Sequence, residues 1–373
     1  MADIMNTGAN FIPTEARPAP LSVRPGPLTW LRENLFDTWY NALFTLLGIY
    51  IIWQAVPPAI AWLFINAYWL AAPAEVCDGI TGACWAFIHE KARFIFFGTY
   101  SFDEQWRPGA AVILILATVI ISCMKPFWNK SLLVIWPVSL TICWILMSGG
   151  IFGLAHIPNN LWGGLPITLM LAVLGAVVAF PISIALALGR RSNMPIIKAF
   201  CVGYIELIRG VPLITILFMA SVMLPLFMPE GLTIDKLLRA QVAIIMFLAA
   251  YLAEVVRGGL QAIPKGQYEA ADAMGLSYWQ SMIFIILPQA LKITIPPMVN
   301  TFIGIFKDTS LVLIVGIFDL TSTMRTSIQD LDWRAYFLEG MVFVAIIYFI
   351  FCFSMSKYSQ WLESDLHRGH KRI

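Results

Sequence analysis

The sequence predicts an all-α integral membrane protein, and two observations carry that prediction. Of the 373 residues, 59% are apolar and only 12% are charged, whereas soluble domains carry about 25% charged residues. Several apolar runs also reach the ~20 residues that a helix needs to cross the hydrocarbon core of a bilayer. These runs are continuously apolar rather than alternating, so helices are favoured over a closed barrel.

About eight membrane spans are expected along the chain. With the N-terminus in the cytoplasm, they leave 16 Lys and Arg residues on the cytoplasmic side and 7 outside, and Lys307 within a span completes the 24. This bias predicts that both termini are cytoplasmic. The expected spans are 37–66, 109–124, 131–150, 165–188, 211–229, 239–256, 297–318 and 336–355.

The chain is predicted to have four regions, divided mainly by a glycine- and asparagine-rich loop, GGIFGLAHIPNNLWGG. A proline-rich and disordered cytoplasmic tail comes first. An extension with three spans follows, and then a domain with five spans and a basic cytoplasmic tail. The predicted bounds of these regions are 1–35, 36–160, 161–360 and 361–373.

Most catalytic chemistry finds little support in the sequence. No G-x-x-x-x-G-K-[ST] phosphate loop is present, so ATP binding of that kind is not expected. The four histidines are scattered, no Cys/His spacing suggests a metal site, and no span carries the acids of a proton relay. The chain is therefore not predicted to be an enzyme or to hold a cofactor.

Two short motifs at the predicted cytoplasmic face each place an acid and an arginine one helical turn apart. In ELIRG these are Glu206 and Arg209, and in EVVRG they are Glu254 and Arg257. Residues at i and i+3 lie close enough to pair. The pairs either anchor the helix ends at the interface or frame an inner gate and brace the loop that follows.

A polar segment, KGQYEAADAMGLSYWQSMIFIILPQA, interrupts the apolar runs after the sixth span. It predicts a short alanine-rich helix over Gln267–Met274 that Gly275 stops. Ser277 and Gln280 then form a capping box for a second helix, which Pro288 limits. The small side chains would let another protein approach closely, although a connector packed on the membrane is the alternative.

This segment resembles the EAA loop of ABC importer permeases. The family spacing EAA-x3-G-x9-I-x-L-P is matched at every fixed position, by Glu269, Ala270, Ala271, Gly275, Ile285, Leu287 and Pro288. The resemblance implies that the EAA segment is a coupling helix that rests in a groove of a partner ATPase.

The surrounding residues resemble the polar amino acid permeases, over roughly residues 163–360. The matching motifs are Gly163-Gly164 with Thr168, ELIRGVP at 206–212, AEVVRGG at 253–259 and KDTSL at 307–311. The stretch 82–108 of the N-terminal extension is similar to the M-type permease of general L-amino acid ABC transporters. Permeases of this family do not normally need three additional N-terminal spans.

The resemblance implies an inner-membrane permease with a type I importer core of five helices. Its implied partners are a second homologous permease, two ATPase subunits that bind ATP and Mg²⁺, and a periplasmic binding protein that delivers the L-amino acid. Two other functions stay open: a secondary amino acid transporter that works without an ATPase, and a sensor or scaffold that docks through the loop.

Two adjacent charges, Lys307 and Asp308, fall inside the expected seventh span. Counted from Pro297, Lys307 lies ~15 Å along the helix, near the middle of a ~30 Å core. Side chains at i and i+1 point about 100° apart, so each charge needs its own partner. An amino acid offers both a carboxylate and an ammonium group, and neighbouring helices are the alternative. With Thr309 and Ser310 of the same motif, these residues are the candidate substrate pathway.

Two of the six cysteines, Cys77 and Cys84, fall in the first outside loop. An oxidising compartment would allow a disulfide between them, and two separately buried thiols are the alternative. The other four are expected to be free and packed among apolar residues. They are Cys123, Cys143, Cys201 and Cys352.

Overall fold

The computed structural model describes residues 26–229, 231 and 233–368, whose regular secondary structure is helical apart from one pair of two-residue strands and one isolated β-bridge. The chain forms two compact units, residues 1–66 and 67–373. The first contains α1 (Pro27–Leu35) and α2 (Trp39–Ile60), which widens into a π-helical turn at Ala61–Ile65. The second contains α3 (Ala86–Phe97), α4 (Trp106–Cys123), α5 (Leu132–Ser148), β1 (Gly163–Gly164), α6 (Leu165–Arg190), α7 (Pro195–Gly210), α8 (Leu213–Phe218), α9 (Leu224–Leu226), α10 (Lys236–Ala262), α11 (Lys265–Ala273), α12 (Tyr278–Ser281), α13 (Leu287–Asp308), β2 (Phe318–Asp319), α14 (Leu320–Ser327) and α15 (Phe337–Arg368).

The described residues confirm an all-α membrane fold. Six of their helices are long and apolar enough to cross a membrane, and a bent pair brings the number to seven. The third expected span, 131–150, corresponds to α5 (Leu132–Ser148), an apolar helix that is slightly shorter than the others. The second part of the bent pair, Leu213–Leu226, corresponds to the fifth expected span, 211–229. The first part of the pair is α7, and the chain bends by 103° between α7 and α8. ELIRG therefore closes α7 instead of opening a span.

The expected start of the seventh span is wrong. A single long helix begins at Tyr278, passes through α12, a π-helical turn at Met282–Ile286 and α13, and ends in a 3₁₀ segment at Val315. Pro288 therefore does not end the second helix of the loop. It is the second residue of α13, directly after the π turn, and the wider i→i+5 winding there accommodates a ring that would clash in an ordinary α-turn.

The predicted tails also differ from the structure. Residues 1–25 of the expected N-terminal tail lie outside the described residues, and Pro27–Leu35 form helix α1 instead of disordered chain. At the other end α15 continues to Arg368, well past the expected limit at residue 355, and residues 369–373 are outside the described range. The extra turns of α15 pack on the end of α4, where Tyr358 donates to the Cys123 carbonyl at 3.1 Å.

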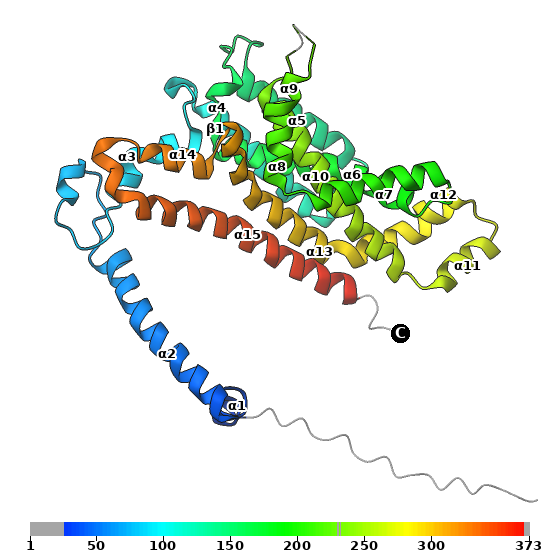
Figure 1. The fold of residues 1–373 in the computed structure, drawn as a ribbon, viewed down its shortest axis with the longest axis horizontal. Helices are drawn as coiled ribbons and strands as arrows, with labels where there is room; N and C mark the ends of the chain where they lie inside the picture. Colours follow the sequence, from blue (N-terminus) through cyan, green and yellow to red (C-terminus); the bar gives the residue numbers. More distant parts are fainter. Residues whose placement is uncertain (1–25, 230, 232, 369–373) are drawn as a thin grey trace, which may run out of the picture. The chain divides into compact units, whose positions relative to one another are not determined.

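Helix α10 lies at the centre of the second unit and packs against α6, α7, α8 and α13. Small residues let these helices approach closely. A Cβ at Gly259 of α10 would lie 2.3 Å from a methyl carbon of Thr294 on α13. Figure 1 shows α15 running alongside α13. The core is therefore built mainly from helices of the expected five-span domain.

Helices of the N-terminal extension pack on this core. Thr323 of α14 donates to the Ile95 carbonyl of α3 at 2.7 Å. Arg107 of α4 is fully buried and donates to the carbonyls of Leu146 and Ala155, which joins α4 to the end of α5 and its following loop. Parts of both expected regions thus share one compact unit, and the boundary between residues 160 and 161 stays a prediction.

The two short strands join distant parts of the chain. Gly163 and Gly164 pair in parallel with Phe318 and Asp319. Gly164 has φ +72°, and a Cβ there would lie 2.1 Å from the Phe96 carbonyl oxygen, so only glycine fits. The buried Asp319 caps α14 by accepting from two backbone N–H groups, and Tyr348 of α15 donates to it at 3.2 Å.

Candidate functional site

The candidate site begins with the EAA loop, which projects from the bundle between α10 and the long helix that starts at Tyr278. We call this end of the bundle the coupling end. Helix α11 stops in a Schellman turn: Gly275 donates to the Asp272 carbonyl and Leu276 donates to the Ala271 carbonyl. Gly275 has φ +70°. The predicted glycine stop is confirmed, and its cause is the left-handed backbone conformation.

The predicted capping box is also confirmed. The Ser277 amide donates to the Gln280 side chain at 2.9 Å, and the Gln280 amide donates to the Ser277 hydroxyl. These two bonds satisfy backbone donors that the first turn of α12 leaves without helical partners. Gly275 and Ser277 together fix the short connection between α11 and the long helix.

The residues of the EAA motif divide into a packed set and an exposed set. Ala271 is buried, and Ile285 and Leu287 are half-buried against an apolar cluster formed by the coupling ends of α6, α10 and the long helix. Glu269 and Ala270 are exposed. The packed set holds the loop on the bundle, and the exposed set leaves a short polar helix on the surface.

Helix α11 is held in place by the side chains of Tyr268 and Gln289, neither of which was identified from the sequence. The hydroxyl of Tyr268 donates to the Leu260 carbonyl of α10 at 3.0 Å, and Arg191 donates to that hydroxyl at 3.2 Å. Gln289 of α13 donates to Gln267 at 3.1 Å. An aromatic residue within a segment of small and polar residues was the available signal for Tyr268. The loop is therefore connected by specific polar contacts to α10, to α13 and to Arg191, the residue that follows α6.

A network of charges lies beside the loop and joins α6, α7 and α10. Glu254 pairs with Arg257 at 2.8 Å, as the i, i+3 spacing predicts. Glu206 does not pair with Arg209; it accepts from Arg190 of α6 at 2.8 Å instead. This correction has a geometric reason, since α7 packs beside the end of α6 and brings Glu206 to its arginine.

The two motifs meet at Glu254. Arg190 also reaches this carboxylate at 2.9 Å, and Arg209 lies 3.6 Å from it. The Glu254 side chain is only 13% exposed. This carboxylate is mostly shielded from water and lies among three arginines, so one negative charge joins partners that come from three helices.

Lys307 and Asp308 lie at the C-terminal end of α13. Lys307 is exposed and Asp308 is half-buried. Neither side chain forms an ion pair or hydrogen bond with another residue in the described part of the chain. Thr309 is buried and donates to the Phe306 carbonyl, and Ser310 donates to the Lys307 carbonyl. The two hydroxyls therefore support the helix end, and the two charges lack a partner within the described chain.

The depth of Lys307 cannot be counted from Pro297, because the long helix starts at Tyr278. The opposite end of the bundle is a better reference point for the depth of Lys307. There Lys236, the first residue of α10, donates to the Gly316 carbonyl at 3.0 Å. The 3₁₀ segment Thr309–Val315 separates Gly316 from α13 and spans ~14 Å at about 2 Å per residue.

Comparison with known proteins gives the family. Residues 179–368 match the model of the binding-protein-dependent transport system inner membrane component. The chain is also 49% identical over 351 residues to the inner membrane amino-acid ABC transporter permease protein YhdY of Escherichia coli (strain K12). This alignment covers 92% of this chain and 94% of that protein. The chain belongs to this permease family. It is a membrane subunit of an ABC importer and not an enzyme.

A second relative of this permease agrees with that family. The permease is 38% identical to the glutamate/glutamine/aspartate/asparagine transport system permease protein BztC of Rhodobacter capsulatus, over 97% of this chain and 99% of that protein. A solved structure described as an amino acid ABC transporter with histidines has a chain 33% identical to it. That match covers 54% of this permease and 92% of the other chain, with a TM-score of 0.49.

At the opposite end, the permease carries a disulfide-closed loop in its N-terminal extension. Cys77 and Cys84 are bonded, with their Cα atoms 6.0 Å apart, which is within the usual range for disulfides. The Cys84 amide donates to Glu339 of α15 at 3.2 Å. The structure thus brings together the two cysteines that the sequence singled out and connects their loop to α15.

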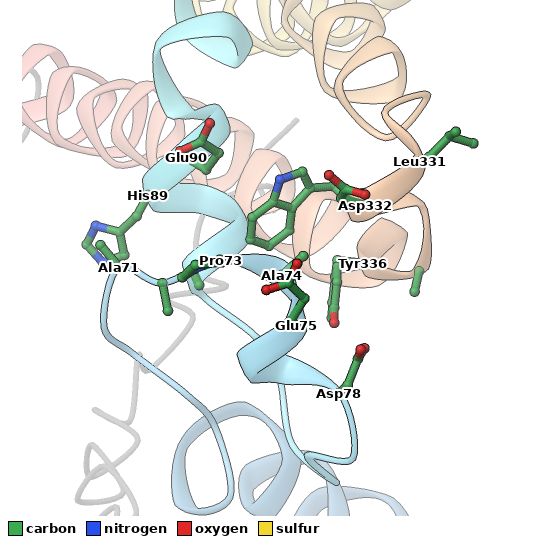
Figure 2. A pocket seen from close by; sticks show the side chains of 14 residues that line it. Ala71, Pro73, Ala74, Glu75, Asp78, His89, Glu90, Leu331, Asp332 and Tyr336 are labelled. Atoms are coloured by element: carbon green, nitrogen blue, oxygen red, sulfur yellow. The ribbon is translucent and has the colours of Figure 1, made fainter.

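A pocket of about 750 Å³ lies between this loop, α3 and the 3₁₀ turn before α15. Figure 2 shows acidic side chains around it, and the described residues of its lining include no Lys or Arg. No three His, Cys, Asp or Glu residues in the described ranges are grouped to hold a metal ion. Its acidic lining residues are Glu75, Asp78, Glu90 and Asp332.

Beside this pocket, Lys91 of α3 pairs with Asp330 at 2.7 Å. The hydrogen bond from the Lys91 ammonium group lowers the pKa of the Asp330 carboxyl below its ordinary value. Both groups are in contact with water, so this pair orients α3 more than it stabilises the fold.

Proposed function

We propose that this permease carries polar L-amino acids into the cell and obtains its energy from separate ATPase subunits that dock on α11. The relatives named above as amino acid permeases support this substrate class. The single observation that carries the coupling role is the geometry of α11: an exposed helix with Glu269 on its surface, tied at its base by Tyr268.

The chain has no phosphate loop of the G-x-x-x-x-G-K-[ST] type, so the energy of ATP must arrive through contact with another subunit. A docked loop transmits that energy only if it binds the conformations of the ATPase with different affinities. The ties from Tyr268 and Gln267 make this mechanism physically reasonable, because a loosely attached helix would absorb the movement of the ATPase without displacing the bundle.

We further propose an assembly of this permease with a second homologous permease, two ATPase subunits and an external binding protein. In it the coupling end and both termini face the cytoplasm of the bacterial inner membrane. ATP and Mg²⁺ are bound by the ATPase subunits, and this chain needs no cofactor of its own. The charge bias of the loops supports this orientation.

The proposed substrate pathway passes Lys307, Asp308, Thr309 and Ser310. An exposed ammonium group that lacks a counter-ion within the described chain is costly inside a membrane. A partner carboxylate from the second permease or from the amino acid would offset that cost. The ~14 Å between Lys307 and the opposite end of the bundle supports a position well inside a ~30 Å core.

The proposal is tested by reconstituting the permease in proteoliposomes with its ATPase and binding-protein partners. Uptake of labelled glutamate, glutamine, aspartate and asparagine is expected to require ATP inside and binding protein outside. Uptake that persists without the ATPase subunits, driven by an ion gradient, would instead identify a secondary transporter. ATPase docking without any uptake would identify a scaffold.

A further inference from the structure

A second pocket, of about 470 Å³, opens on the side of the bundle near the end opposite the EAA loop. Its walls come from α8, the π-helical turn Met219–Met223, α9 and the first three turns of α10. Most of the lining is apolar, and it includes three methionines, whose flexible side chains adapt to ligands of irregular shape. The main apolar residues are Ile216, Met219, Met223, Leu224, Phe227, Leu238, Val242 and Met246.

Arg239, in the first turn of α10, is the one charged residue among the described residues of this lining. Its Nη1 donates to the Ser221 carbonyl at 2.6 Å, which holds the guanidinium group against the π turn. Its Nε is shielded from solvent and has no hydrogen-bond partner. Among the described residues no carboxylate lies within ion-pair distance of Arg239.

The nearest acid in sequence among the described residues is already engaged. Asp235 caps α10, where its carboxylate accepts from the amides of Leu237 and Leu238. Arg239 therefore stands at an apolar pocket with unused donors and a full positive charge. It lies one turn inside the end of α10 that begins at Lys236. If α10 crosses the membrane, headgroups are expected near this end of the helix.

We propose that this pocket binds one anionic phospholipid, with its phosphate on Arg239 and an acyl chain along the methionine-rich wall. A cation at the headgroup level and an apolar cavity below it match the two ends of such a lipid. Among the described residues, the pocket lining holds no carboxylate to receive the ammonium of a zwitterionic headgroup, which favours a lipid with a net negative charge. The site is separate from the EAA loop and from Lys307.

The test uses the complete importer complex in nanodiscs of phosphatidylcholine with added phosphatidylglycerol, followed by native mass spectrometry of the lipids that stay bound. Arg239→Gln removes the charge. Val242→Phe narrows the pocket and keeps Arg239. Arg334→Gln is the matched control, because Arg334 is exposed on the 3₁₀ turn before α15 and does not line this pocket.

The wild-type complex and Arg334→Gln are expected to retain one phosphatidylglycerol more per permease than Arg239→Gln. Arg239→Gln is expected to bind this lipid about tenfold more weakly, and Val242→Phe is expected to weaken it as well. Equal retention in the wild type and Arg239→Gln would overturn the proposal, as would equal retention of phosphatidylcholine. Efficient crosslinking of Val242→Cys to the second permease would show that protein covers the pocket and would also overturn it.

Discussion

Arg190 at the end of α6 lies 2.9 Å from Glu254 on α10, and the same guanidinium group lies 2.8 Å from Glu206 on α7. One arginine thus joins the two acids of ELIRG and EVVRG across three helices. The apolar cluster under the EAA loop lies at the same end of the bundle. The network therefore stabilises the end of the bundle from which α11 projects.

The two acids of this network should contribute unequally to stability. Glu254 contacts three arginines and Glu206 contacts one. Glu254→Gln leaves three cations without their common anion and is expected to cost about 2 kcal/mol, whereas Glu206→Gln should cost under about 1 kcal/mol. Thermal unfolding of the two purified variants measures the difference. Equal losses would mean that the arginines are solvated and the network is weak.

The effect of a substitution at Gly275 should depend on how readily the new residue adopts a positive φ, and not on the size of its side chain. A Cβ there meets no atom within 4 Å, so the cost of Gly275→Val comes from φ +70° alone, roughly 1–2 kcal/mol. We expect Gly275→Val to weaken ATPase recovery or substrate-stimulated hydrolysis, and Gly275→Asn to be milder. Gly266→Ala, on α11 with similarly open space, is the control. Equal coupling in Gly275→Val and the wild type would contradict the importance of the turn.

Glu269 should act through its charge at the surface of α11. It is exposed, so Glu269→Lys is expected to leave the fold and membrane insertion intact while lowering ATPase association about tenfold or more. Asp272→Lys makes the same charge change at another position of the same short helix, and it is the control for the specificity of the Glu269 position. Pull-down of the ATPase with the permease measures association. Identical losses in both variants would indicate a general charge effect instead of a specific contact.

Lys307 and Asp308 should affect transport more than assembly. Lys307→Met and Asp308→Asn remove charges that have no ion-pair partner in the described chain, so the isolated permease should be equally or more stable. Substrate uptake per assembled complex is expected to fall tenfold or more. If the amount of assembled complex falls in proportion to uptake, the charges hold the two permeases together and do not serve the substrate.

The bond between Cys77 and Cys84 should be present in the protein purified from the membrane. Alkylation is expected to label both cysteines only after reduction, and intact mass should then increase by two alkyl groups. Closing so short a loop stabilises by roughly 2–3 kcal/mol on the chain-entropy model, so Cys84→Ser should lower the unfolding temperature. Equal labelling before and after reduction would show two free thiols.

Local features of this chain were predictable and contacts between distant segments were not. The Ser277–Gln280 capping box and the Gly275 stop depend on neighbouring residues, so their spacing in the sequence was sufficient. The partner of Glu206 was missed because the i, i+3 rule sees only Arg209, while Arg190 arrives from another helix. Tyr268 was missed for the same reason, because its role depends on Leu260 and Arg191.

The seventh span shows a different limit of prediction from the sequence. Proline normally ends or kinks a helix, so Pro288 predicted a break. The π-helical turn that accommodates it extends over five apolar residues, Met282–Ile286, and nothing in their composition distinguishes a π turn from an α turn. The depth predicted for Lys307 was counted from Pro297, the expected start of the span, and had to be counted again from Gly316 because the long helix begins at Tyr278.

The pairing of Gly163 with Phe318 has a consequence for how the protein is made. The two strands are separated by 155 positions in the sequence, so a ribosome that adds about 5–20 residues per second needs roughly 8–30 s between them. During that interval α6 and α10 can already be inserted and packed, whereas the Gly163–Gly164 backbone has no strand beside it. Closure of the bundle at this end is therefore a late event of biogenesis, which follows insertion of the long helix that begins at Tyr278.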